Sequence, residues 1–264
     1  MKFHKSVFYL TSAVAGAFLL QSCASTDVAD VGDVNQKKIH QHYSIDIDQD
    51  NGRMEAEAQF RFGGSTGTTL NLTGDAGVTI NGEKLDGDEQ LFRGLVYSRR
   101  ISDDVDYTFV FTDADGGTYT NSLKLEPIDL DRLPQEISGR ESVQISWAGA
   151  PVGKFETVRI YASDDENILG MEIGSTSANG ANSVKTNPND VKQLLNGGGS
   201  IYIVRSIDKP LDEEGDEGGE LRGDYTSESY SIEIVDAKTE AQANAEAAEL
   251  EQELKELEEE LENL

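Results

Sequence analysis

A two-residue alternation of apolar and polar side chains constrains the fold of this 264-residue chain more than any other feature. In the stretch 39–50 the odd positions Tyr43, Ile45 and Ile47 are apolar and the even positions are polar. The stretch 53–62 repeats the pattern at Met54, Ala56, Ala58, Phe60 and Phe62. Because successive strand side chains point to opposite faces, each stretch predicts a strand with one buried face.

The dipeptide Asn51-Gly52 between these strands predicts a tight hairpin turn, since both residues tolerate positive φ. A two-residue turn would pair Ile47 with Ala56. The apolar faces of the two strands would then coincide.

Further short strands follow, separated by Gly- and Asp-rich turns, at the spacing of an all-β protein. The pattern predicts them at 69–72, 78–81, 91–101, 107–112 and 118–125, and then at 142–147, 156–162, 200–207 and 225–235. A short helix is predicted at 190–195, after the cap Asn187 and Pro188. We therefore predict two β-sandwiches, at 39–126 and 142–236, joined by a proline-containing linker at 127–141.

Three motifs carry a resemblance at the level of the fold: YTFVFTDADGGTYTNSLKL (107–125), VQISW (143–147) and FETVRIYA (155–162). With the linker between them they resemble tandem immunoglobulin-like modules of secreted bacterial lipoproteins. The second module is similar to fibronectin type III in its early-strand Trp147 and its final hairpin. The resemblance implies a fold and an extracytoplasmic setting, and no chemistry.

The start of the chain has the layout of a secretory signal: Lys2 and Lys5, then an uncharged run from Val7 to Leu20. That run of about 14 residues is shorter than the roughly 20 that a membrane-spanning helix needs. The sequence Leu20-Gln21-Ser22-Cys23 resembles the lipobox of bacterial lipoproteins. The resemblance implies a signal peptide at 1–22, acylation of Cys23 with palmitate or a similar chain, and a tether at 23–38. Ala24, in place of Asp, implies sorting to the outer membrane of the cell envelope.

The net charge of −28 restricts the partners. Removing residues 1–22 removes two lysines and no acidic residue, which makes the mature chain more negative still. Such a surface repels phosphates, so we expect no nucleic-acid partner, whereas cations and basic proteins are favoured. The sequence contains no H-E-x-x-H arrangement. With Cys23 acylated, the mature chain has no free cysteine and only two histidines, His40 and His42, so we expect no enzyme.

Two short motifs are candidate sites. The two-residue turn would place Asp48 opposite Glu55 and Asp46 opposite Glu57, and four such carboxylates predict either a calcium site or a solvated acidic face. The tripeptide Arg222, Gly223 and Asp224 lies in a predicted acidic, glycine-rich loop before the last strand. It resembles an integrin-binding adhesive loop; the alternative is an ordinary Gly-Asp turn.

The C-terminal stretch 237–264 predicts an acidic helix of coiled-coil type. Its apolar seam is Ala247, Leu250, Leu254, Leu257, Leu261 and Leu264, and glutamates 251, 253, 258 and 260 flank it. Because these glutamates would repel one another in a parallel homodimer, we expect a basic protein partner; the alternative is a solitary, solvated helix.

The sequence therefore predicts a non-enzymatic lipoprotein that serves as a binding or scaffold module. The alternative is a carbohydrate-active or other hydrolase that uses surface carboxylates. A close carboxylate pair of raised pKa in a deep cleft would favour the hydrolase, and flat sheet faces would favour the binding module.

Overall fold

The computed structural model describes residues 26–164 and 170–239, together with ten single or paired positions between 241 and 261. The protein is mostly β, with several sheets and one short α-helix among the described residues. The predicted all-β class is thus confirmed in its coarse form.

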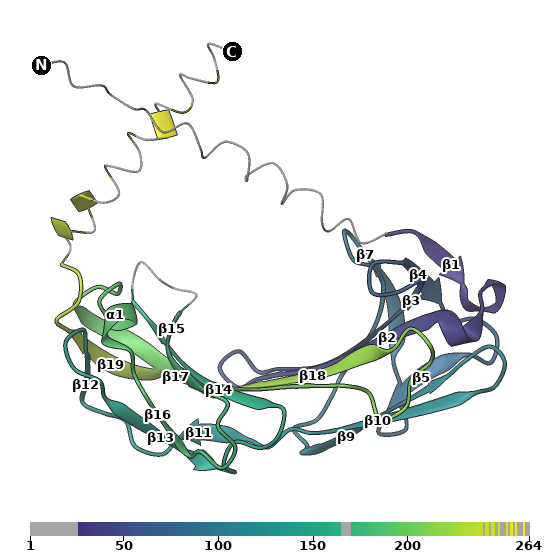
Figure 1. The fold of residues 1–264 in the computed structure, drawn as a ribbon, viewed down its shortest axis with the longest axis horizontal. Helices are drawn as coiled ribbons and strands as arrows, with labels where there is room; N and C mark the ends of the chain where they lie inside the picture. The colour runs from purple at the N-terminus through teal and green to yellow at the C-terminus, as the bar shows by residue number, and fades with distance from the viewer. Residues whose placement is uncertain are drawn as a thin grey trace, which may run out of the picture.

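One large sheet runs through the whole molecule (Figure 1). Its main path is β1 (Val28–Asp30), β4 (Thr68–Asn71), β3 (Arg53–Phe62), β2 (Ile39–Asp48), β18 (Gly219–Thr226), β17 (Gly197–Lys209), β14 (Glu156–Ser163) and β15 (Met171–Thr176). Four further strands join this path at its sides: β7 (Asp86–Gln90), β8 (Gly94–Arg100), β12 (Glu136–Ser138) and β19 (Tyr230–Val235).

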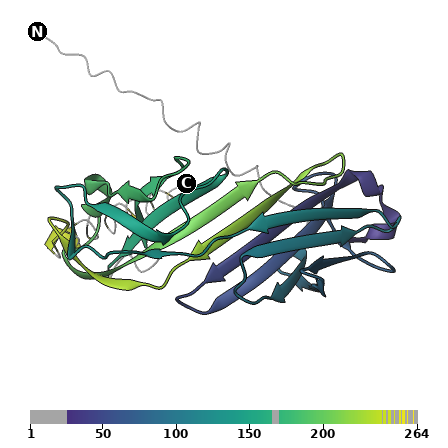
Figure 2. The ribbon, with the colours of Figure 1, turned by 90° about the horizontal axis from the view of Figure 1, so that it is seen from below.

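Two small sheets lie against the convex side of the large sheet, one at each end of the molecule (Figures 1 and 2). The first contains β10 (Thr118–Lys124), β9 (Asp106–Thr112), β5 (Gly77–Ile80) and β6 (Glu83–Lys84). The second contains β11 (Ile128–Leu130), β13 (Gln144–Gly149) and β16 (Ser183–Lys185). Among the described residues, no second sheet covers the concave side of the large sheet.

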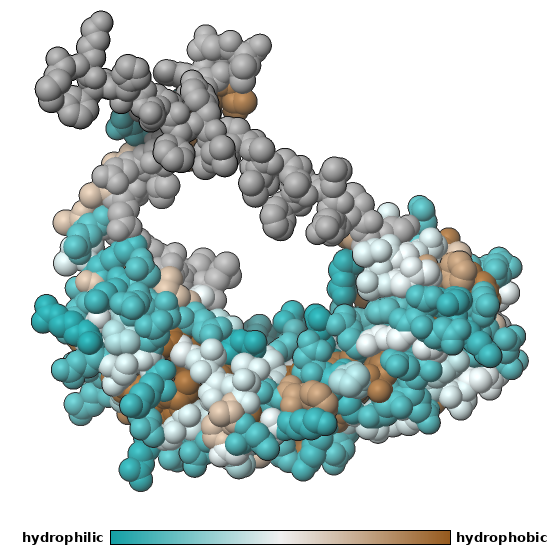
Figure 3. Space-filling view, viewed as in Figure 1, coloured by the Kyte–Doolittle hydropathy of each residue, from teal (hydrophilic) through white to brown (hydrophobic). Residues whose placement is uncertain are grey.

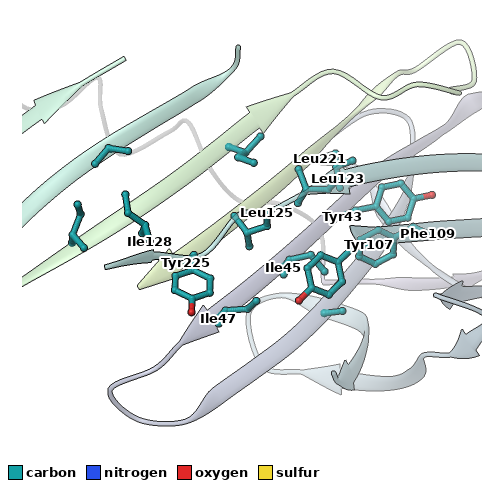
Figure 4. Close-up of a cluster of buried hydrophobic side chains, with 14 of the residues drawn as sticks. Tyr43, Ile45, Ile47, Tyr107, Phe109, Leu123, Leu125, Ile128, Leu221 and Tyr225 are labelled. Carbon is teal, nitrogen blue, oxygen red and sulfur yellow. The ribbon is translucent and has the colours of Figure 1, made fainter. Parts of the chain in front are cut away.

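The core lies between the layers and follows the predicted alternation. Every odd position of β2 from Ile39 to Ile47 is buried, while the even positions are half-buried. In β18, Leu221, Gly223 and Tyr225 are buried in the same way. Figure 4 shows side chains of β2, β9, β10, β18 and β11 in one hydrophobic cluster, so the core continues across the junction of the two predicted domains.

The stretch 127–141, predicted as a linker, is built into the sheets. It contains β11, which pairs with β13, and β12, which pairs in parallel with β19. In addition, β18 pairs in parallel with β2 over eight residue pairs. β18 belongs to the second predicted domain and β2 to the first, so this pairing connects the two predicted domains. The two halves share one sheet.

The first hairpin is confirmed, but its predicted register is wrong by two residues. Asp48 pairs with Arg53, and Ile47 pairs with Met54. The loop contains four residues because the Asp48 carboxylate accepts hydrogen bonds from the Asp50 and Asn51 amides at 3.0 and 3.2 Å. A shift of two residues keeps every side chain on its face, so the buried set is unchanged.

A short helix, α1 (Pro188–Val191), begins at the predicted cap, where the Asn187 side chain accepts a hydrogen bond from the Asn189 amide. It ends at Val191 and not at the predicted residue 195. The predicted C-terminal helix lies largely outside the described residues. Its described positions are helical but scattered, and no continuous helix is defined among them. Within the part of the chain that the structure describes, no helix has the length and apolar character to cross a membrane.

Candidate functional site

The concave side of the large sheet, called the outer face below, presents polar side chains from four central strands. These are the even-numbered residues of β2, β18 and β17 and the odd-numbered residues of β14, which lie opposite the buried set. Strand pairing aligns them in rows, such as Glu57, Ser44, Arg222 and Asp208. Figure 3 shows the molecule edge-on, with mostly hydrophilic residues along the concave edge.

Several charged side chains on the β2 side of the outer face form ion pairs. Arg53 forms an ion pair with Asp46, and Arg93 pairs with Glu57 at 2.6 Å. Glu220 accepts from the Arg222 guanidinium at 2.5 Å and contacts His42 Nδ1 at 2.9 Å. Although the whole chain is strongly acidic, this region is a mosaic of both signs.

The arrangement that motivated the calcium prediction is therefore absent. Asp46 lies opposite Glu55, but Asp48 caps the turn and Glu57 lies opposite Ser44. Among the residues that the structure describes, no three His, Cys, Asp or Glu side chains converge closely enough to hold a metal ion.

One carboxylate on the outer face titrates abnormally. Burial raises the pKa of Asp46 above its usual value, Arg53 opposes that shift, and Asp224 and two further carboxylates add to it. Glu55, Asp46 and Asp224 occupy one row across β3, β2 and β18. These three residues line none of the pockets described below.

The tripeptide Arg222, Gly223 and Asp224 lies inside β18 and not in a loop. β17 pairs with it on one side and β2 on the other. Arg222 is bound to Glu220, and Asp224 accepts a hydrogen bond from the Ser206 hydroxyl. The predicted loop presentation is wrong, because the alternation of Leu221, Gly223 and Tyr225 places this stretch in the sheet.

His40 and His42 both occupy the outer face of β2. Burial lowers the pKa of each imidazole, and the nearby Glu220 opposes that shift. Both side chains therefore favour the neutral form more than free histidine does.

At the opposite end of the large sheet, the outer face contains a hollow of about 620 Å³, called the serine hollow below. It is lined by Gln135, Ser163, Asp164, Gly198, Gly199, Ser200, Ser231, Ile232 and Glu233. Ser163 and Ser200 lie opposite each other in β14 and β17, with their hydroxyl oxygens 2.6 Å apart. Ser231 of β19 lies on the other side of Ser200. Small side chains on three neighbouring strands thus leave the space open.

A pair of tyrosines stands next to the serine hollow. Tyr161 and Tyr202 lie opposite each other, two residues along their strands from Ser163 and Ser200. Their rings are stacked, with centroids 5.2 Å apart and planes inclined by 10°. Burial raises the pKa of both phenols, so both hydroxyls are protonated and can donate hydrogen bonds at neutral pH.

The serine hollow is lined by serine side chains, the Glu233 carboxylate and two glycines, and the stacked tyrosines stand beside it. Such a set suits a polar ligand with several hydrogen-bonding groups. The sequence analysis predicted a strand at 200–207 but no binding site here. Gly198 and Gly199 line the hollow, and the alternation of Ser200 and Tyr202 along that strand was the signal that could have located it.

A second crevice, of about 520 Å³, opens between β9 and β10 of the first small sheet and the loop 153–155 that precedes β14. Its lining includes Lys124, Lys154, Lys209 and Phe155. Lys124 pairs with Glu126, Lys209 pairs with Asp212 at 2.8 Å, and Lys154 Nζ lies 4.4 Å from the centre of the Phe155 ring. These lysines have internal partners, so the crevice is less suited than the serine hollow to bind a charged ligand.

Cys23 lies outside the described residues, and so do three of the six seam positions of the C-terminal stretch. The other three, Leu254, Leu257 and Leu261, are described and exposed. No protein-family model matches the chain, and no curated protein does so either.

Proposed function

We propose that this protein is a non-enzymatic, lipid-anchored binding or scaffold module of a bacterial cell envelope, with the outer face of the large sheet as its ligand-contact surface. One observation carries the proposal: the serine hollow and the stacked tyrosines lie side by side on an open sheet face, where they combine a hydroxyl-lined hollow with aromatic surface. The anchor at Cys23 and sorting to the outer membrane rest on the lipobox-like sequence.

Two finer features belong to the same proposal. Each end of the molecule is an immunoglobulin-like sandwich, one small sheet on half of the large sheet, which agrees with the two-layer arrangement. The C-terminal stretch serves as a helix for a basic protein partner, which its glutamate-rich flanks favour. Nucleic acid is not a partner, since the net charge is −28.

A hydrolase remains the second candidate, because Asp46 has a raised pKa and lies in a row with Glu55 and Asp224. That row lies on the sheet face, outside the pockets, and Arg53 pairs with Asp46. A binding role therefore agrees better with the site than acid–base catalysis.

Site-specific photo-crosslinking in native envelopes tests the contact surface. A photoreactive residue in place of Ser231, which is exposed and lines the hollow, should form adducts with the bound ligand or partner. The matched control replaces Thr118, which is exposed on β10 of the convex side. Adducts at both positions, or at Thr118 alone, would contradict the assignment of the outer face.

Metabolic labelling tests the anchor. A palmitate analogue should label the wild-type protein, and Cys23→Ala should abolish the label. Equal labelling of both proteins would rule out acylation at Cys23.

A further inference from the structure

The hairpin between β7 and β8 presents two adjacent large apolar side chains to solvent. Leu91 is 81% exposed and Phe92 is 80% exposed, the highest values among the large hydrophobic residues described. Burying two such side chains elsewhere would be favourable, so their joint exposure at a hairpin tip indicates a contact surface.

The tip is held in a defined conformation. The Arg93 amide donates to the Gln90 carbonyl at 3.2 Å, and Phe92 and Gly94 have φ of +66 and +73. On the sheet side, the Arg93 carbonyl accepts hydrogen bonds from two side chains of β3, Gln59 Nε2 and the Arg61 guanidinium, each at 2.8 Å. Arg61 itself is only 6% exposed. The turn is therefore fixed from the sheet, with its two apolar side chains directed outwards.

The start of the described chain lies at the base of this hairpin. A Cβ atom placed on Gly94 would be 3.3 Å from the Thr26 carbonyl oxygen. Thr69 links the two segments: its amide and hydroxyl donate to the Asp27 carbonyl at 2.9 and 2.7 Å, and its hydroxyl accepts from the Leu95 amide at 3.2 Å. The N-terminal segment is thus attached to the base of the tip.

Cys23 precedes Thr26 by three residues, and three residues of extended chain span at most about 10 Å. An acyl chain on Cys23 would therefore hold the membrane surface within a short distance of the hairpin. Val28 of β1, which is 41% exposed, adds a further apolar side chain near the N-terminal segment.

We propose that Leu91 and Phe92 insert into the bilayer to which Cys23 is anchored, as a second membrane contact beside the lipid. The proposal rests on the lipid anchor of the proposed function. The two contacts together fix the orientation of the protein. Because β1 and β7 lie at one end of the molecule and β19 at the other, the serine hollow is held at the end far from the membrane (Figure 1).

The charges around the tip limit the depth of insertion and the kind of lipid. Asp86, Asp88 and Glu89 of β7 are exposed just before the tip. Carboxylates remain in water, so insertion stops at the two apolar side chains, and anionic headgroups repel this end of the protein. A zwitterionic bilayer surface is the expected occupant, reached by the shallow insertion typical of interfacial apolar residues.

A fluorescence experiment tests the contact on the full chain, purified from envelopes and placed on phosphatidylcholine vesicles with brominated acyl chains. Leu91→Trp adds an indole at the tip, while the single native tryptophan, Trp147, is buried and gives a constant background. We expect the added emission to shift to shorter wavelength and to be lost by bromine quenching. Leu133→Trp is the matched control, because Leu133 is 42% exposed in the stretch between β11 and β12, and it should be neither shifted nor quenched.

Mass spectrometry of the same preparation separates this proposal from the lipid anchor. If Cys23 carries acyl chains, the protein binds the vesicles directly; if its thiol is free, the anchor proposal fails and the thiol is coupled to a maleimide lipid in the same vesicles. In either case, an unquenched Leu91→Trp on the vesicle overturns insertion of the tip. Equal quenching of Leu91→Trp and Leu133→Trp also overturns it, and quenching that increases with anionic lipid contradicts the charge argument.

Discussion

The two ends of the large sheet have cores of different chemistry. The first end, under β10, β9 and β5, is packed with aromatic rings: Phe60 stacks on Phe111 with centroids 4.2 Å apart, and Tyr43 lies 4.8 Å from Phe109. The second end, under β11 and β13, is mainly aliphatic and contains a fully buried arginine. Arg205 is 0% exposed and pairs with Glu156 at 2.8 Å.

This difference indicates that the two ends tolerate change differently. The aromatic side chains at the first end contact several rings each, so replacing one of them leaves the contacts among the others intact. At the second end a single carboxylate compensates a buried charge. The Arg205 guanidinium also donates to the Ala150 carbonyl at 2.5 Å, and its Nε, alone among the buried side-chain N and O atoms described, has no hydrogen-bond partner. The stability of the second end therefore depends on one buried ion pair, and losing either partner leaves the other uncompensated.

The largest effect should follow from breaking this pair. Glu156→Ala leaves Arg205 buried without its counter-ion and removes the acceptor of the Gly153 amide, 2.8 Å away. We expect the free energy of unfolding to fall by about 3–5 kcal/mol. Urea titration followed by circular dichroism measures this change.

A double substitution is the control for the ion pair. Glu156→Leu with Arg205→Met removes both charges, and apolar replacement of a buried pair is often neutral or stabilising. The double variant should therefore recover most of the loss. A double variant no more stable than Glu156→Ala would show that packing, and not the uncompensated charge, determines the cost.

The junction between the ends should be the next most sensitive place. Gly223 lies in β18, and a Cβ atom there would be 2.6 Å from Leu123 Cδ2. Gly223→Ala should lower the free energy of unfolding by about 1–3 kcal/mol through overpacking.

Gly77→Ala is the matched control, because Gly77 also lies in a strand and a Cβ atom there would meet nothing within 4 Å. It should change stability little. If Gly223→Ala were as well tolerated, β18 would not be closely packed between the two ends.

The sequence predicted those parts of the fold whose side chains alternate over long stretches. β2, β3, β9 and β10 begin and end within a few residues of the expected positions. β18 was missed because its charged and glycine residues suggested a loop. Its buried Leu221, Gly223 and Tyr225 do alternate, but a glycine in the middle carries no hydropathy signal. Short strands such as β11 and β12 contain too few residues to show a period.

The site was harder to predict than the fold. The predicted cluster of four carboxylates was wrong because hydrogen bonds within the turn set the register. Asp48 accepts hydrogen bonds from two loop amides, and the loop therefore has four residues. The serine hollow combines residues from β14, β17 and β19, far apart in the sequence. Leu91 was assigned to a strand, but β8 begins only at Gly94, so the exposed tip was also missed.

A smaller effect is expected from trimming one ring at the aromatic end. Phe60→Leu keeps most of the buried volume but loses the stacked contact with Phe111 and the edge contacts with Tyr43 and Tyr97. We expect a loss of about 1 kcal/mol, since a volume-conserving substitution is tolerated and one aromatic pair contributes about that much. Thermal unfolding measures it. A loss as large as that of Glu156→Ala would contradict the contrast between the two ends.

The smallest effect concerns pH and also distinguishes the ends, because both histidines among the described residues, His40 and His42, lie at the first end. Burial lowers the pKa of both side chains in the folded protein, and Glu220 opposes the shift only in part. Below an unfolded pKa of about 6.5 the unfolded chain therefore binds more protons than the folded chain, and stability falls as the pH falls.

Between pH 7 and about 5.5, where unperturbed carboxylates remain charged, the urea midpoint of the wild type should decrease as the pH is lowered. The midpoint should decrease less for the double variant His40→Gln with His42→Gln. Glu156→Ala should lower the midpoint at every pH without changing how steeply it depends on pH. A wild-type midpoint that rises on acidification would mean that the contact of His42 with Glu220 outweighs burial.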